Sequence, residues 1–129
     1  MTFAIGGLSS LPRDECSLVE GRMPEGGGFF TVGCGNASKW TARTTEWYPN
    51  AEIARHVFEE RIQKAFRVHE LNQKTGANRE IIGDRVVADL RHQQSGALFT
   101  SIFWLADRHI YSVDSTSYYY ALFYEWCDE

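Results

Sequence analysis

The chain of 129 residues contains no long hydrophobic run and no leader-like start. A membrane-spanning helix needs about 18 uninterrupted apolar residues, and no segment reaches that length. The first residues also lack the basic stretch followed by an apolar stretch that is typical of a secretory signal peptide. We therefore expect a cytoplasmic protein with no membrane partner.

Cysteine is scarce, and the three cysteines are far apart. Cys16, Cys34 and Cys127 are an odd number and include no C-x-x-C pair. Structural zinc and redox sites usually use such closely spaced pairs, so neither is expected here. Free thiols are the favoured interpretation of all three, and a bridge between Cys16 and Cys34 is the main alternative.

Positive charge is also in short supply. The chain has 13 Lys and Arg against 17 Asp and Glu, which gives a net charge of -4. Nucleic acids are bound by clustered basic side chains. Here Lys64, Arg67 and Lys74 alternate with glutamates, a pattern typical of a solvated helix face with local ion pairs. We therefore expect no nucleic-acid partner.

Catalytic signatures are missing as well. No G-x-S-x-G nucleophile elbow occurs, and the glycine runs at residues 6–7 and 26–28 lack the flanking elements and lysine of a phosphate loop. His56 and Glu60 lie one helical turn apart but bring no third ligand for a metal. The sequence thus predicts no catalytic residue, no cofactor and no metal. On these grounds we expect that the protein is not an enzyme.

The chain does contain one strongly patterned helix, predicted from Asn50 to Gln73 and extending at most to residue 75. Asn50 follows Pro49 and is a good N-cap, while Gly76 indicates the end of the helix. An apolar stripe with helical spacing is formed by Ala54, Val57, Phe58, Ile62, Ala65 and Val68. This stripe predicts a helix that buries one side against a sheet.

Strand patterns lie on both sides of this helix. Residues 29–48 predict a hairpin, and residues 79–114 predict a three-stranded meander with turns near residues 93–96 and 107–108. Residues 1–28 are expected to be largely irregular, apart from a short strand at residues 2–5.

Residues 115–126 have the propensity for either a short helix or a strand. The length of the chain suits a single domain. We therefore predict one α+β domain in which a long amphipathic helix packs on a curved antiparallel sheet.

The strand predicted from Gly96 to Ala106 has apolar side chains on both faces. One face carries Ala97, Phe99, Phe103 and Leu105, and the other carries Leu98, Ile102 and Trp104. Since the helix can cover only one face, the other needs a further segment or a second subunit. The leading hypothesis is therefore a non-enzymatic interaction or assembly module. Its second sheet face would bind another copy of the chain or another protein.

Polar residues interrupt the apolar stripe of the helix, namely Arg61 near its middle and His69 and Asn72 nearer its end. One interpretation is a small-ligand or enzyme pocket between helix and sheet. Arg61 would hold an anion there and His69 would exchange a proton, with Trp104 or Tyr111 lining the pocket.

The other interpretation of Arg61 and His69 is structural. Buried charges are normally paired, so Arg61 would form an ion pair with Asp84 or Asp89. His69 would then be hydrogen-bonded at the edge of the sheet. Both interpretations stay open from the sequence.

The order of a strand, a helix and antiparallel strands over residues 39–114 resembles the architecture of the cystatin protease inhibitors. The glycines at residues 6–7 and the segment Arg85 to Asp89 look like the N-terminal glycine and the Q-x-V-x-G hairpin of that family. However, Arg85 replaces the glutamine, Asp89 replaces the turn glycine, and no Pro-Trp hairpin follows. The resemblance therefore implies a cystatin-like architecture without inhibitory activity.

Overall fold

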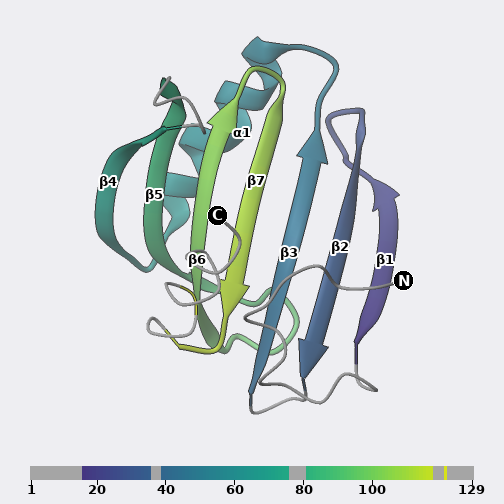
Figure 1. Cartoon of the computed structure of the whole chain (residues 1–129), viewed down its shortest axis with the longest axis vertical. Helices are drawn as coiled ribbons and strands as arrows, with labels where there is room; N and C mark the ends of the chain where they lie inside the picture. Colours follow the sequence, from purple (N-terminus) through teal and green to yellow (C-terminus); the bar gives the residue numbers. More distant parts are fainter. Residues whose placement is uncertain (1–15, 36–38, 76–80, 118–120, 122–129) are drawn as a thin grey trace.

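The computed structural model describes residues 16–35, 39–75, 81–117 and 121 of the chain. They form the helix α1 (Ala51–Lys64) and a seven-stranded antiparallel sheet. Its strands are β1 (Ser17–Arg22), β2 (Gly28–Gly35), β3 (Trp40–Trp47), β4 (Arg67–Thr75), β5 (Ile81–Arg91), β6 (Leu98–Ala106) and β7 (His109–Ser115). The strand order is β1-β2-β3-β7-β6-β5-β4, so β1 and β4 are the two edges (Figure 1). The predicted α+β class with an antiparallel sheet is confirmed.

Helix α1 packs on one face of the sheet, which we call the helix face. It contacts β5, β6 and β7, and Figure 1 shows it behind that half of the sheet, away from β1 and β2. Phe58 of the helix meets the ring of Phe103 edge to face, with 5.5 Å between the ring centroids. The buried core on this face consists of Tyr48, Ala54, Phe58, Val86, Ala88, Phe103, Leu105 and Ile110. Each large side chain buried here stabilises the fold by roughly 1.5–3 kcal/mol.

The helix begins where the sequence predicts and ends earlier. The side chain of Asn50 accepts a hydrogen bond from the Ile53 backbone N–H at 2.8 Å, as an N-cap should. At the other end Ala65 is extended, and the Phe66 N–H donates to the Asp89 carbonyl at 2.9 Å. The chain thereby enters β4, and the helix has 14 residues. The prediction of a helix reaching Gln73 is wrong because pairing with β5 outweighs the local helical pattern.

The hairpin and the meander are confirmed. Strands β2 and β3 pair antiparallel, as do β5 with β6 and β6 with β7. Within the region predicted to be irregular, residues 17–22 instead form β1, which pairs with β2 at the edge of the sheet. The short strand predicted at residues 2–5 lies outside the described residues. So does most of the segment predicted at residues 115–126.

The glycine run at residues 26–28 forms the turn from β1 into β2. Gly26 and Gly27 have φ angles of 94° and 84°, a region that favours glycine. A Cβ atom on Gly27 would lie 2.0 Å from the Trp47 carbonyl oxygen. These glycines let the turn pass close to the end of β3, which brings β1 alongside β2.

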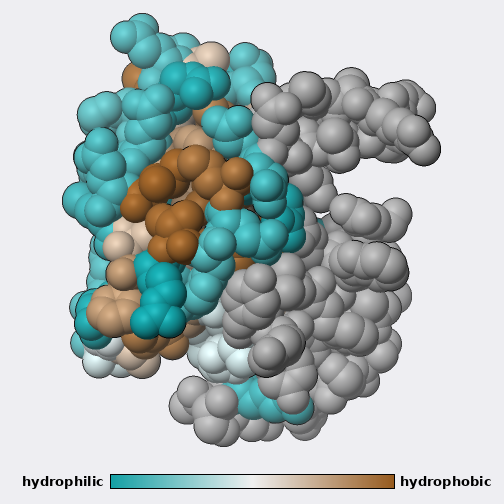
Figure 2. All heavy atoms as spheres, turned by 90° about the vertical axis from the view of Figure 1, so that its left-hand side faces the viewer, coloured by the Kyte–Doolittle hydropathy of each residue, from teal (hydrophilic) through white to brown (hydrophobic). Residues whose placement is uncertain are grey.

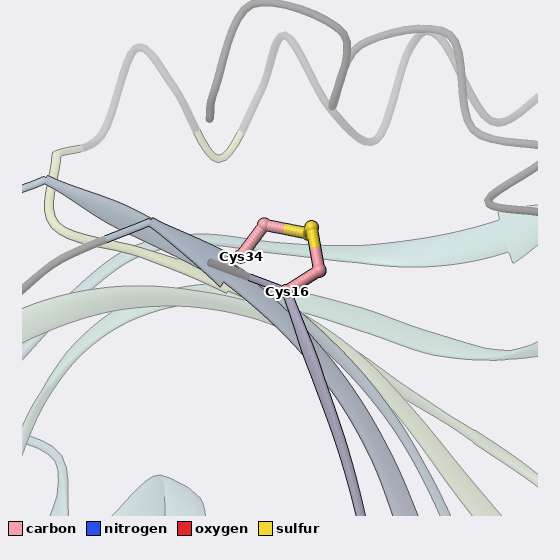
Figure 3. The surroundings of a disulfide bond; sticks show 2 residues. All are labelled: Cys16 and Cys34. Atoms are coloured by element: carbon pink, nitrogen blue, oxygen red, sulfur yellow. A yellow bond between two sulfur atoms is a disulfide. The ribbon is translucent and has the colours of Figure 1, made fainter. Parts of the chain in front are cut away.

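A disulfide joins Cys16 to Cys34, with 3.9 Å between the two Cα atoms (Figure 3). The pairing of Ser17 with Gly33 in the β1–β2 ladder places the two cysteines opposite each other. The expectation of free thiols is therefore wrong for this pair. It failed because β1 was not predicted, and without β1 nothing brings Cys16 near Cys34.

The face of the sheet opposite α1, which we call the back face, is also apolar at its centre. Val87 and Ile102 are fully buried there, and Ala121 packs against them. The two-sided apolar character predicted for β6 is therefore present. Ala121 of the same chain covers part of the second side of β6.

Within the described residues, no helix is long and apolar enough to cross a membrane.

Candidate functional site

A cleft of about 920 Å³ lies on the helix face, where the sheet extends past α1 toward β1. Its floor is polar and consists of Thr44, Glu46, Ser101, Ser112 and Asp114. Its apolar walls include Val19, Phe29, Leu90 and Phe99, and the turn at residues 92–94 contributes to its rim. The volume and the mixture of apolar walls with a few polar groups are typical of small-molecule sites.

Strand register places the polar side chains of the floor side by side. Thr44 of β3 is opposite Ser112 of β7, and Ser101 of β6 is opposite Asp114 of β7. Successive residues of a strand point to opposite faces, so these four side chains share the helix face with Phe103 and Ile110. Because α1 covers only the apolar half of this face, the polar half faces the cleft.

Arg61 reaches from α1 to the floor of the cleft and forms a bidentate ion pair with Glu46. Its two terminal nitrogens lie 3.0 Å and 2.7 Å from the two carboxylate oxygens. The side chains of Arg61 and Glu46 are only 20% and 8% exposed. The Tyr48 hydroxyl also donates to Glu46, and the Arg61 guanidinium lies over the Phe103 ring. The pair is therefore partly desolvated and anchored on both sides.

Burial of this ion pair affects the pKa values of Arg61 and of the neighbouring Tyr48. Burial lowers the pKa of Arg61, but the nearby Glu46 carboxylate outweighs it, so the net shift is upward. The pKa of Tyr48 is raised by burial first and by its hydrogen bond to Glu46 second. Arg61 thus remains a cation and Tyr48 a neutral donor over the working pH range.

Asp114 is the residue of the cleft floor whose carboxylate has an unfilled hydrogen-bond position. Its Oδ1 atom is buried and has no hydrogen-bond partner among the described residues. The pKa of this carboxyl is raised to about 6, chiefly by burial. The hydrogen bond with Ser101 and the charge of Arg61 lower the pKa, while the negative charge of Glu46 raises it further. A buried carboxyl that has a raised pKa and one oxygen without a hydrogen bond, and that lines a cleft, is characteristic of functional sites.

Replacing Asp114 by asparagine should stabilise the protein at about pH 8. The native carboxyl holds its proton up to about pH 6, whereas an unfolded Asp releases it near pH 4. Wild-type stability therefore falls as the pH rises between these values. Since one pKa unit corresponds to about 1.4 kcal/mol and the carboxamide keeps part of the desolvation cost, we expect a gain of roughly 2 kcal/mol.

Urea unfolding of wild type and Asp114→Asn at about pH 4 and about pH 8 measures this effect. The difference between the two proteins should be larger at the higher pH. An equal difference at both pH values would contradict the raised pKa of Asp114.

Of the four residues predicted to line a pocket, Arg61 alone lines this cleft. His69 lies toward the back face, where its Nε2 atom is 2.9 Å from Asp89 Oδ2. Thr100 donates to Asp89 Oδ1 at 2.9 Å, and these three residues line a separate pocket of about 260 Å³. The predicted pairing of Arg61 with Asp84 or Asp89 is wrong, since Arg61 pairs with Glu46 and Asp89 with His69.

Trp104 and Tyr111 form an aromatic row on the back face. Their ring centroids are 5.8 Å apart, and the His109 ring stacks on Tyr111 at the same spacing. The four predicted residues thus do not form one site. That His69, Trp104 and Tyr111 bind a ligand stays a prediction.

Glu46 and Asp114 were not singled out from the sequence. Glu46 belongs to a strand with polar residues on both faces, and Asp114 ends a predicted strand where a turn residue is ordinary. One signal was present, because a charge on the apolar stripe of α1 calls for an opposite charge in the core. That signal leads from Arg61 to a carboxylate but does not say which one.

No metal centre is visible in the part of the chain that the structure describes, where no three His, Cys, Asp or Glu side chains gather closely enough. His56 and Glu60 lie 3.7 Å apart on the exposed side of α1.

Neither a protein-family model, nor a curated protein, nor a solved structure matches this chain. Functional inference therefore rests on the geometry of the cleft.

Proposed function

We propose that the protein binds a small organic ligand in the cleft beside α1. The observation that carries this proposal concerns Asp114, a residue of the cleft floor whose buried Oδ1 atom has no partner among the described residues. A buried polar atom without a hydrogen bond costs about 1–3 kcal/mol. A ligand that donates to this oxygen would recover that cost. Phe29 and Phe99 would pack against its apolar part.

A fragment screen by ligand-observed NMR tests this proposal. Fragments that bind the wild type should lose binding to Thr44→Trp, because the new indole fills the cleft. The matched control is Thr45→Trp, since Thr45 is the next residue of β3 and points to the back face. Binding that is lost equally in both variants, or in neither, would contradict the proposed site.

A second candidate function, an interaction module, is supported by the edge strand β4. Figure 2 shows an apolar area bordered by hydrophilic residues on the side of the molecule that carries β4. Phe66, which directly precedes β4, and Val68 and Leu71 within β4 are 51%, 42% and 60% exposed. The outer edge of β4 has no strand partner in the described sheet. Edge strands with exposed apolar side chains readily pair with another chain. We propose a second copy of this chain as the partner.

Light scattering on a concentrated sample tests self-association through β4. The wild type should form a dimer, and Leu71→Lys should be monomeric. Leu18→Lys, at the opposite edge of the sheet and 48% exposed, is the control that should leave the dimer intact. A monomeric wild type would rule out this second candidate.

The cystatin-like architecture is retained as a proposal about the fold alone. A helix followed by antiparallel strands that face it supports the likeness. The segment Arg85 to Asp89 lies within β5, and its central residues Val86, Val87 and Ala88 are fully buried. They cannot act as an exposed inhibitory hairpin.

The location of the protein is also a proposal. The sequence predicts the cytoplasm, whereas the bond between Cys16 and Cys34 favours an oxidising compartment. Structural disulfides persist in such compartments and are rare in the cytosol. We therefore propose an oxidising compartment in place of the cytoplasm.

A further inference from the structure

The charges around the cleft floor determine which ligands it can accept. On the cleft floor the carboxylates of Glu46 and Asp114 face the Arg61 guanidinium, while Arg91 and His92 line the rim. Glu46 accepts two hydrogen bonds from Arg61 and one from Tyr48, so its charge is compensated. Asp114 has a hydrogen bond with Ser101, but its Oδ1 atom has no partner among the described residues, and Arg61, which is already paired with Glu46, offsets the charge of its ionised form only in part.

The charged groups at the rim are engaged away from the floor. The Arg91 guanidinium donates to the Gly96 carbonyl at 3.1 Å and lies over the Phe66 ring, 5.0 Å from its centroid. His92 Nδ1 faces the Ser95 N–H within its own turn, at 3.5 Å. Neither side chain is therefore placed to compensate Asp114.

The chemistry of the unpartnered atom narrows the ligand class further. Asp114 Oδ1 is an acceptor, so a ligand carboxylate or phosphate would put a second acceptor and a second negative charge against it. A neutral hydroxyl could donate, but it would leave the charge in place. A protonated amine supplies both a donor and the opposite charge. Its body would lie between apolar walls that include Phe29 and Phe99.

We propose that the cleft selects ligands in which a protonated amine is attached to an apolar, ring-sized body, with the ammonium donating to Asp114 Oδ1. This inference rests on the proposed function, because it names the ligand class of the same cleft. The interaction is non-covalent, and Glu46 and Arg61 form the fixed polar wall beside it.

Three probes that share one ring system and differ in one group test the inference: naphthylethylamine, naphthylethanol and naphthylacetate. Affinities for the wild type are measured by calorimetry at about pH 8. We expect the amine to bind at least tenfold more tightly than the alcohol, and the carboxylate to bind most weakly. Asp114→Asn should weaken the amine at least tenfold and change the alcohol less than twofold. Asp107→Asn, in the exposed β6–β7 turn, is the matched control and should change neither.

The pH dependence gives a second readout. Protonation of Asp114 removes the counter-ion, so amine affinity should fall as the pH drops below about 6, while alcohol affinity should not. Thermal unfolding of Asp114→Asn confirms that the variant is folded. Equal affinity for amine and alcohol would overturn the amine inference and leave the cleft as a binding site. Absence of binding by all three probes, together with an empty fragment screen, would overturn the proposed function as well.

Discussion

Replacing Glu46 by alanine is expected to lower the free energy of unfolding by about 3–5 kcal/mol, since removing one partner of a buried ion pair leaves the other charge uncompensated. Arg61 is only 20% exposed and would lose both of its hydrogen bonds to Glu46. The Tyr48 hydroxyl would lose its acceptor at the same time. Urea unfolding at neutral pH measures the change.

Two further variants separate the charge from the lost volume. Glu46→Gln keeps the size of the side chain and an acceptor for Tyr48, so most of its effect reports the missing charge. The double variant Glu46→Leu with Arg61→Met should recover much of the loss, because a buried ion pair can be replaced by apolar groups at little cost.

An exposed ion pair on the same helix provides the control. Arg55 and Glu59 lie 4.0 Å apart with side chains about 60% exposed, and Glu59→Gln should change stability by less than about 0.5 kcal/mol. A loss for Glu46→Ala no larger than that for Glu59→Gln would show that the Glu46–Arg61 pair is not buried as described.

The parts of the fold that the sequence predicts well are those set by local signals. Asn50 identifies the start of α1 because its side chain bonds to a backbone group three residues later. The end of α1 was missed because Ala65 and Val68 continue the helical spacing. What ends the helix is the pairing of β4 with β5, and the pair nearest the helix end, Arg67 with Asp89, joins residues 22 positions apart. Such distant contacts leave no mark in a periodicity analysis.

The candidate site was only partly predictable for a similar reason. Arg61 stands out because a guanidinium on an apolar stripe is unusual, and the structure places it in the cleft. Its partner Glu46 comes from β3, and Asp114 comes from β7. These strands become neighbours only when the sheet forms, so the sequence alone could not bring the three residues together. His69 was grouped with Arg61 because a helix was assumed to continue through residue 69.

Removing the disulfide by the double substitution Cys16→Ala and Cys34→Ala should cost about 3 kcal/mol, the chain-entropy value expected for closing a loop of this length. The two cysteines are 18 residues apart, and the loop between them contains β1 and the turn into β2. The cross-link restricts the unfolded chain, and it also holds the edge strand β1 in register with β2. Since Val19 of β1 lines the cleft, the double variant should also bind cleft ligands more weakly.

Unfolding in urea with and without a reductant measures the contribution of this bond. Reduction should destabilise the wild type by about the same amount as the double substitution, and it should leave the double variant unchanged. Thiol titration of the denatured wild type should find two fewer reactive groups before reduction than after it. If reduction changes neither the stability nor the thiol count, the two cysteines are free. The argument for an oxidising compartment would then fail, while the Asp114 cleft, which does not depend on this bond for its floor, would still stand.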